Sequence, residues 1–176
     1  MVRRDVGLAT LPPVWHAAAR PFVGGPPDEA ASRLCADLVD ELLRCDAFLF
    51  AIPMYNFGVQ QQVKHWIDLV ICDPRAADVS IPLLAGRGGV LVETRGGGYG
   101  PGSPRHGWNH ATPYLRRILG DVWGLRLEHI EVELTEAEHD PAMAHLRDQA
   151  RDGIAEAHRR AWRAAAAVTG TAPVTA

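Results

Sequence analysis

The sequence predicts an α/β protein in which a parallel sheet carries helices on both faces. Two short apolar runs, at residues 47–52 and 88–93, lack the alternation of a half-exposed strand, and such runs are typical of strands buried on both faces. After each run and a loop, apolar residues recur with the spacing of an amphipathic helix. This alternation of strands with helices favours a parallel sheet between two helical layers.

Length and composition predict one globular domain over residues 1–176, with a disordered tail after about residue 168. The net charge of −3 leaves no basic surface of the kind that binds nucleic acid, so we expect no nucleic-acid partner. No apolar run approaches the ~20 residues of a membrane-spanning helix. The N-terminus does not match a secretory signal, and we expect a cytoplasmic protein without membrane contacts.

The first half of the chain divides into four expected segments. Val2–Leu8 is expected as a short strand, and prolines and glycines make the stretch up to residue 27 irregular. Asp28 is expected to cap a helix, because the residues after it place one apolar stripe on a helical face. That stripe consists of Ala31, Leu34, Cys35, Leu38, Val39, Leu42 and Leu43. The strand at residues 47–52 follows, and Pro53 ends it.

Beyond the first strand, the same strand–loop–helix unit is expected to repeat. Apolar positions between residues 59 and 71 mark a helix that Pro74 is expected to end. The strand at 88–93 leads into a glycine-rich loop over 94–108. The remaining expected elements are a helix that begins at Pro113 and is closed by Gly124, a strand within 125–134, and a helix over 141–167.

Neither the cysteines nor the histidines form a recognisable site pattern. Three cysteines without close spacing argue against a disulfide framework and against a zinc site, and Cys35 on the apolar stripe is expected in the core. The histidines are scattered, with no convincing ligand spacing, so we expect no metal.

The first loop at the expected carboxyl edge of the sheet follows the strand at 47–52. It contains Pro53, Met54, Tyr55, Asn56 and Phe57. These residues offer aromatic rings, a thioether and an amide, but no acid, base or nucleophile. That set suits a flat, partly apolar ligand whose edge needs one hydrogen-bond donor and one acceptor. The alternative is a loop whose aromatic rings simply cover the core.

The second loop at this edge begins with Thr94, Arg95, Gly96 and Gly97. Glycines allow backbone N–H groups to approach a ligand closely, and Arg95 adds a permanent positive charge. The loop does not match the dinucleotide-binding fingerprint, because no helix begins within it. The alternative is a flexible surface loop. Ligands of parallel sheets bind at the carboxyl ends of the strands, which is where both loops are expected.

Both loops resemble a known family. The run from Pro53 to Val59 (PMYNFGV), followed by residues 62–70 (QVKHWIDLV), resembles the flavin loop and helix of FMN-dependent NADH-azoreductases. These enzymes are also described as NAD(P)H:quinone oxidoreductases and have a flavodoxin-like fold. Residues 94–102 (TRGGGYGPG) resemble the second flavin loop of the family, and residues 113–120 resemble its next helix. The similarity extends over about residues 3–150.

The resemblance implies an FMN cofactor, with NADH or NADPH as electron donor and a quinone or azo compound as acceptor. The flavin would carry the chemistry, so no side chain is expected to be catalytic in its own right. The ring would be lined by the residues of the first loop, from Pro53 to Phe57. Thr94, Arg95, Gly96 and Gly97 would face its pyrimidine edge.

The resemblance also implies a homodimer with the flavin near the subunit interface. Trp66, Trp108 and Trp123 lie in segments near the expected site, and aromatic residues are enriched in interface cores. We therefore expect these three rings to contribute to such an interface.

The chain departs from the family at its N-terminal end. The family begins with a strand, a serine-rich phosphate-binding loop and a helix, and this first β-α unit is missing here. Residues 2–6 instead resemble the second strand of the family. Two alternatives follow: a family-derived binding or accessory factor that has lost FMN binding, or a longer protein whose start lies upstream.

Overall fold

Three parallel strands form the sheet of the computed structural model, which describes residues 1–169. Their spatial order is β1-β2-β3, and Leu49 of β1 lies beside Val90 of β2. This confirms the expected α/β fold with a parallel sheet. The strands are β1 Ala47–Ala51, β2 Gly88–Thr94 and β3 Arg126–Val132.

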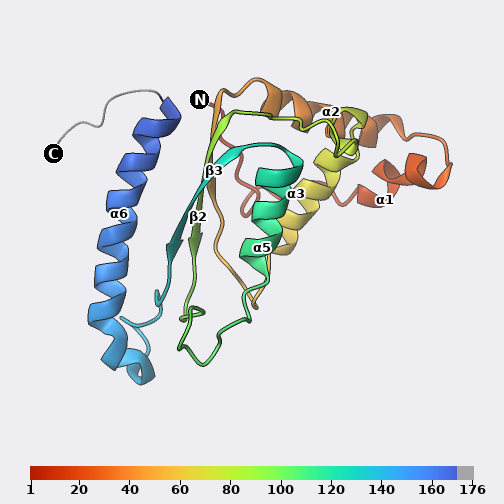
Figure 1. The fold of residues 1–176 in the computed structure, drawn as a ribbon. Coiled ribbons are helices and arrows are strands. Elements are labelled where there is room, and N and C mark those ends of the chain that lie inside the picture. Colours follow the sequence, from red (N-terminus) through yellow and green to blue (C-terminus); the bar gives the residue numbers. More distant parts are fainter. Residues whose placement is uncertain (170–176) are drawn as a thin grey trace.

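Helices cover both faces of this sheet. Figure 1 shows α6 on one face and α2, α3 and α5 on the other, which makes three layers. The longer helices are α2 Glu29–Leu43, α3 Gln61–Ile71, α5 Ala111–Arg116 and α6 Arg147–Thr169. The shorter ones are α1 Trp15–Ala18, α4 Pro74–Ala77, two 3-10 helices at Arg20–Val23 and Pro141–Leu146, and a π-helical segment at Arg117–Val122 that continues α5. No helix within residues 1–169 is both long and apolar enough to cross a membrane.

Local sequence signals explain the start and the buried face of α2. The Asp28 side chain accepts a hydrogen bond from the backbone N–H of Ala31 at 2.9 Å, so it is the expected N-cap. Cys35, Leu38 and Val39 on the apolar stripe are buried in the main core. The expected core role of Cys35 is confirmed, and burial raises the pKa of its thiol to about 11.

Aromatic rings link the sheet to the helices on the α3 side. The Trp66 ring meets the Trp123 ring edge-on with centroids 5.3 Å apart, and it packs against Phe50 of β1 at 6.2 Å. Because Trp66 and Trp123 are buried in this core, the expectation that they form a dimer interface is wrong for this structure. Trp108 remains exposed.

Strand β1 is covered on one face only. Phe48 and Phe50 point toward α3, but Leu49 points to the opposite face and is 72% exposed. The expectation that this apolar run is buried on both faces is therefore wrong. The reason is that α6 packs over β2 and β3, while no described strand pairs with the outer edge of β1.

Other local expectations also need correction. Val2–Leu8 is not a strand, since these residues pair with none of the three described strands. Pro74 does not simply stop α3, which ends at Ile71, but occupies the first position of α4. Helix α5 begins at Ala111, two residues before Pro113. Gly124 ends that helical stretch as expected, with a φ of 80°. The expected disordered tail falls on residues outside the described range, apart from Thr169.

Candidate functional site at the carboxyl edge of the sheet

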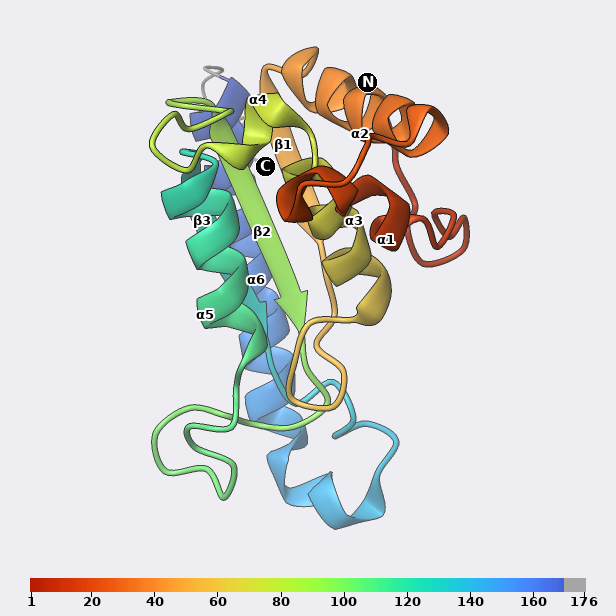
Figure 2. The same ribbon diagram turned by 90° about the vertical axis from the view of Figure 1, so that its right-hand side faces the viewer.

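Three loops meet where the strands end, near the bottom of Figure 2. Backbone pairing continues beyond the strands, since Met54 N–H donates to the Thr94 carbonyl at 2.9 Å and Arg95 N–H donates to the Val132 carbonyl at 2.8 Å. The loops that follow β1, β2 and β3 therefore start at the same level of the sheet. Both loops singled out in the sequence lie in this group.

The first loop makes a tight reversal at Asn56 and Phe57. Tyr55 and Gly58 exchange backbone hydrogen bonds, at 3.3 Å and 3.0 Å, around this pair. Asn56 has φ 48° and Phe57 has φ 67°, as in a type I′ turn. Asn tolerates this left-handed region, but a bulky residue such as phenylalanine is strained there. Backbone strain of this kind is concentrated at functional sites in proteins.

Aromatic contacts hold Phe57 against the second loop. Its ring meets the Trp108 ring edge-on with centroids 5.4 Å apart and the Tyr99 ring at 6.3 Å. The His110 N–H donates to the Phe57 carbonyl at 2.8 Å. The structure thus brings the two loops into contact. The rings of Tyr55, Phe57 and Trp108 remain exposed to solvent.

Not every residue of the first loop presents its side chain at the surface. Met54 is buried, whereas Asn56 is exposed and its side chain makes no hydrogen bond with another described residue. Pro53 is held by the buried Gln60, whose side-chain amide donates a hydrogen bond to the Pro53 carbonyl. A surface ligand would therefore meet Tyr55, Asn56 and Phe57 before Met54.

In the second loop, the carbonyls of Gly96 and Gly97 are engaged and their N–H groups are not. The Glu136 N–H donates to the Gly96 carbonyl at 3.2 Å, and the Leu134 N–H donates to the Gly97 carbonyl at 3.3 Å. Within residues 1–169, the N–H groups of Gly96 and Gly97 have no hydrogen-bond partner. A Cβ at Gly96 would lie 2.8 Å from Glu136 Cγ, so glycine permits this close approach.

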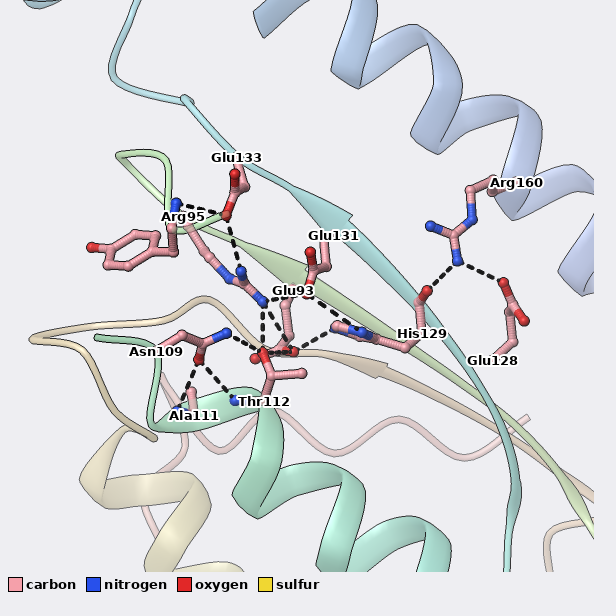
Figure 3. A network of polar contacts seen from close by, with 11 residues as sticks. Glu93, Arg95, Asn109, Ala111, Thr112, Glu128, His129, Glu131, Glu133 and Arg160 are labelled. Atoms are coloured by element: carbon pink, nitrogen blue, oxygen red, sulfur yellow. Dashed lines mark hydrogen bonds and ion pairs between the residues drawn. The ribbon is translucent and has the colours of Figure 1, made fainter. Parts of the chain in front are cut away.

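The Arg95 side chain points into the protein rather than to the surface. Its guanidinium is 2% exposed and donates to Thr112 Oγ1 at 2.6 Å, to Glu131 Oε1 at 2.8 Å and to Glu133 Oε1 at 3.1 Å (Figure 3). Glu93, fully buried on β2, lies 3.8 Å from the same guanidinium. We call Glu93, Arg95, Thr112, His129, Glu131 and Glu133 the Arg95 cluster.

Thr112 connects this cluster to the start of α5. Its hydroxyl accepts from Arg95 and from Asn109 Nδ2, at 2.6 Å and 2.8 Å, and donates to Glu93 Oε2 at 2.8 Å. A hydroxyl has one donor and two acceptor positions, so Thr112 is fully satisfied. Asn109 also accepts from the N–H groups of Ala111 and Thr112, at 3.1 Å each, and caps the helix.

His129 completes the cluster from β3. Its Nε2 lies 2.6 Å from Glu93 Oε2, although the two atoms do not form an aligned hydrogen bond. Its Nδ1 lies 3.7 Å from Glu131 Oε1. Three carboxylates thus face one guanidinium and one imidazole in a largely buried space.

Most residues of the Arg95 cluster are not among the site residues predicted from the sequence. The sequence feature that could have revealed the cluster is a two-residue spacing of ionisable residues at two strand ends. Glu93 and Arg95 have this spacing at the end of β2, and His129, Glu131 and Glu133 have it at the end of β3. In a strand, this spacing places side chains on one face. The observed register places Glu93 beside Glu131 and Leu91 beside His129, which brings the two sets together. That register was not available from the sequence.

A family model described as a flavodoxin-like fold matches residues 3–156. The chain belongs to this flavodoxin-like family. Among curated relatives, an FMN-dependent NADH:quinone oxidoreductase of Streptomyces avermitilis is 36% identical over 166 residues, which cover 92% of this chain and 76% of the relative.

Other members of the flavodoxin-like family support the same placement. An FMN-dependent NAD(P)H:quinone oxidoreductase of Pseudomonas aeruginosa is 34% identical over 69% of this chain and 65% of its own. Among solved structures, an azoreductase of Bacillus anthracis superposes with a TM-score of 0.67 at 16% identity, over 94% of this chain and 77% of the other. At that identity the superposition shows the shared fold, which confirms the flavodoxin-like class expected from the sequence.

Proposed function

We propose that this chain is an FMN-dependent NAD(P)H oxidoreductase that reduces quinones or azo compounds by two-electron ping-pong transfer. The observation that carries the proposal is the meeting of the two loops at the carboxyl edge, where the Tyr99 and Trp108 rings of the second loop pack against Phe57 and where Gly96 and Gly97 have unpaired N–H groups. The names of the curated relatives support the choice of cofactor and of acceptor class.

The residues present fit the ring of FMN. An isoalloxazine needs an apolar wall and hydrogen-bonding groups at one edge. Tyr55 and Phe57 offer the wall, and the Asn56 amide offers a donor and an acceptor. The unpartnered N–H groups of Gly96 and Gly97 are fixed donors of the kind that stabilise negative charge on a ligand edge. Bound FMN would supply the redox chemistry.

The proposed site therefore consists of Pro53, Met54, Tyr55, Asn56, Phe57, Thr94, Arg95, Gly96 and Gly97. Pro53 and Met54 would support the first loop from below, since Met54 is buried. Arg95 would act from beneath the second loop, since its guanidinium is enclosed. Nicotinamide and acceptor would use the same exposed face in turn, and the chain's task is to position them and exclude water there. A homodimer with the site near its interface is part of the proposal.

The phosphate of FMN lacks an evident cradle among the described residues. Phosphate sites in such folds use hydroxyls and N–H groups at a strand-to-helix turn. Ser103 Oγ donates to the Gly100 carbonyl at 2.8 Å and Ser80 Oγ to Asp78 at 2.6 Å, so both hydroxyls are engaged locally. This observation favours a second candidate function, a binding or accessory factor that does not retain FMN.

A titration with two flavins tests the proposal. We expect this chain to bind FMN only weakly, above the micromolar range that corresponds to about −8.2 kcal/mol. Riboflavin should bind within about a factor of three of FMN, because tenfold discrimination requires about 1.4 kcal/mol of phosphate contacts. Asn56→Ala should weaken both flavins about equally, whereas Phe22→Ala, which removes an exposed ring elsewhere, should not.

Each outcome of the titration has a meaning. Submicromolar FMN binding with riboflavin much weaker would show that a phosphate site exists and that our account of it is wrong. Absence of binding by either flavin, with no NADH-dependent reduction of a quinone, would favour the accessory factor.

A further inference from the structure

The Arg95 cluster contacts the glycine-rich loop at two residues and the helix that follows the loop at a third. Arg95 itself stands at the beginning of the loop, directly after β2. Its guanidinium donates to Thr112, just beyond the end of the loop. It also donates to Glu133, whose Oε1 accepts the backbone N–H of Tyr99 at 3.0 Å. One buried cation therefore connects the start of the loop, Tyr99 within it and the helix that follows it.

The contact through Glu133 is the one that fixes the glycines. Gly96, Gly97 and Gly98 lie between Arg95 and Tyr99, and backbone freedom is greatest at such residues. Arg95 carries the guanidinium, and the Tyr99 backbone is joined to it through Glu133. Both ends of the three-glycine segment are therefore held by one network of hydrogen bonds. The Tyr99 ring packs against the Phe57 ring, and this contact links the held segment to the first loop.

We infer that Arg95 is a positioning residue that holds the glycine-rich loop through Glu133, so that the N–H groups of Gly96 and Gly97 stay free for a ligand. The consequence for flavin binding rests on the proposed function, but the ordering of the loop does not. The guanidinium acts through Glu133 and Thr112, and it does not touch the ligand itself.

The chain provides a matched pair of carboxylates to test this inference. Glu131 and Glu133 both pair with Arg95, and both are partly exposed, at 41% and 27%. Only Glu133 also accepts a backbone N–H of the loop. Replacing Arg95 itself would leave Glu93 buried beside fewer positive charges and risks unfolding the protein, so the partners are the better probes.

The experiment compares Glu133→Ala, Glu133→Gln and Glu131→Ala with the full wild-type chain. Amide hydrogen exchange of residues 96–100 is measured without ligand, together with the thermal midpoint and the riboflavin affinity. Glu133→Ala should accelerate exchange in this segment and weaken riboflavin about tenfold, as expected for one charge-assisted hydrogen bond. Glu133→Gln keeps an acceptor oxygen and should restore slow exchange. Glu131→Ala should leave both readouts near wild type.

The results separate this inference from the proposed function. If Glu133→Ala and Glu131→Ala behave alike in loop exchange, the positioning role is overturned. If Glu133→Ala lowers the thermal midpoint while loop exchange and affinity stay unchanged, Glu133 is merely structural and the inference is equally overturned. If loop exchange responds as expected but the wild type binds no flavin, the positioning role stands and the proposed function fails.

Discussion

The two edge strands of the sheet, β1 and β3, are covered by other elements to very different degrees. On the face that α6 covers, Ile130 of β3 is 1% exposed, whereas Leu49 of β1 on the same face is 72% exposed. The outer strands also differ in composition, because β3 carries charged residues along its length and β1 (AFLFA) carries none. Charged side chains are a common protection of edge strands against further pairing.

The difference shows that β1 has the composition of an interior strand but the position of an edge strand. Its outer backbone groups and its Leu49 face form a template for another strand. The carboxyl-edge loops, in contrast, are ordered by contacts that do not involve the outer edge of β1, such as those of Phe57 with Trp108 and of Arg95 with Glu133. Ordered loops at the carboxyl edge and an open sheet edge can therefore coexist in one chain.

The strongest test of this comparison uses one substitution in two environments. Leu91 of β2 is fully buried, and Leu91→Ala should lower the free energy of unfolding by about 2–5 kcal/mol because it removes contacts and leaves a cavity. Leu49→Ala should change it by less than about 0.5 kcal/mol, as for an exposed position. Urea denaturation followed by tryptophan fluorescence measures both. Similar losses would show that Leu49 is covered in solution.

A second test concerns association through the open edge. The mass of the wild-type chain by light scattering should rise with protein concentration, and Leu49→Lys should reduce this rise, because a charge on an apolar edge opposes pairing. Phe22→Lys is the control, because it introduces the same charge at an exposed ring outside the sheet. A constant dimer mass in both variants would instead indicate that the proposed homodimer forms without the β1 edge.

The sequence predicted the elements whose signals are local. The Asp28 cap and its apolar stripe identified α2, and the apolar runs identified β1 and β2. The N-terminal strand was wrong because a strand exists only when it is paired, and Val2–Leu8 does not pair with any described strand, even though the outer edge of β1 is open. The exposure of Leu49 depends equally on what lies beside β1, which its own residues do not report.

The candidate site was predicted by residue type but not by side-chain direction. The two loops were placed at one edge because parallel strands end together, and their contact through Phe57 and Tyr99 agrees with that argument. The burial of Arg95 was not predictable, because it depends on the register that brings Glu131 beside Glu93. A charged residue in a loop is expected at the surface unless a nearby strand supplies its partners.

A smaller loss of stability than that of Leu91→Ala is expected at Asp73, which lies in the well-packed half of the molecule. This carboxylate caps α4 and accepts two hydrogen bonds at 2.9 Å from the Arg75 side chain, which hold its pKa below the ordinary value of 3.8. A lowered pKa in the folded state means that the carboxylate stabilises the fold above about pH 4, and that this contribution is lost as the pH falls through the lowered pKa. Asp73→Asn should therefore lower the free energy of unfolding at about pH 7 by about 0.5–1 kcal/mol, a modest value because Arg75 is 43% exposed and screened by solvent. The wild-type and variant curves should converge as the pH is lowered toward about 2.

Asp121→Asn, which removes an exposed pair with Arg117, should have almost no effect at any pH. A difference between wild type and Asp73→Asn that stayed constant down to the lowest pH would mean that the cap acts through its geometry alone, without the charge of Asp73.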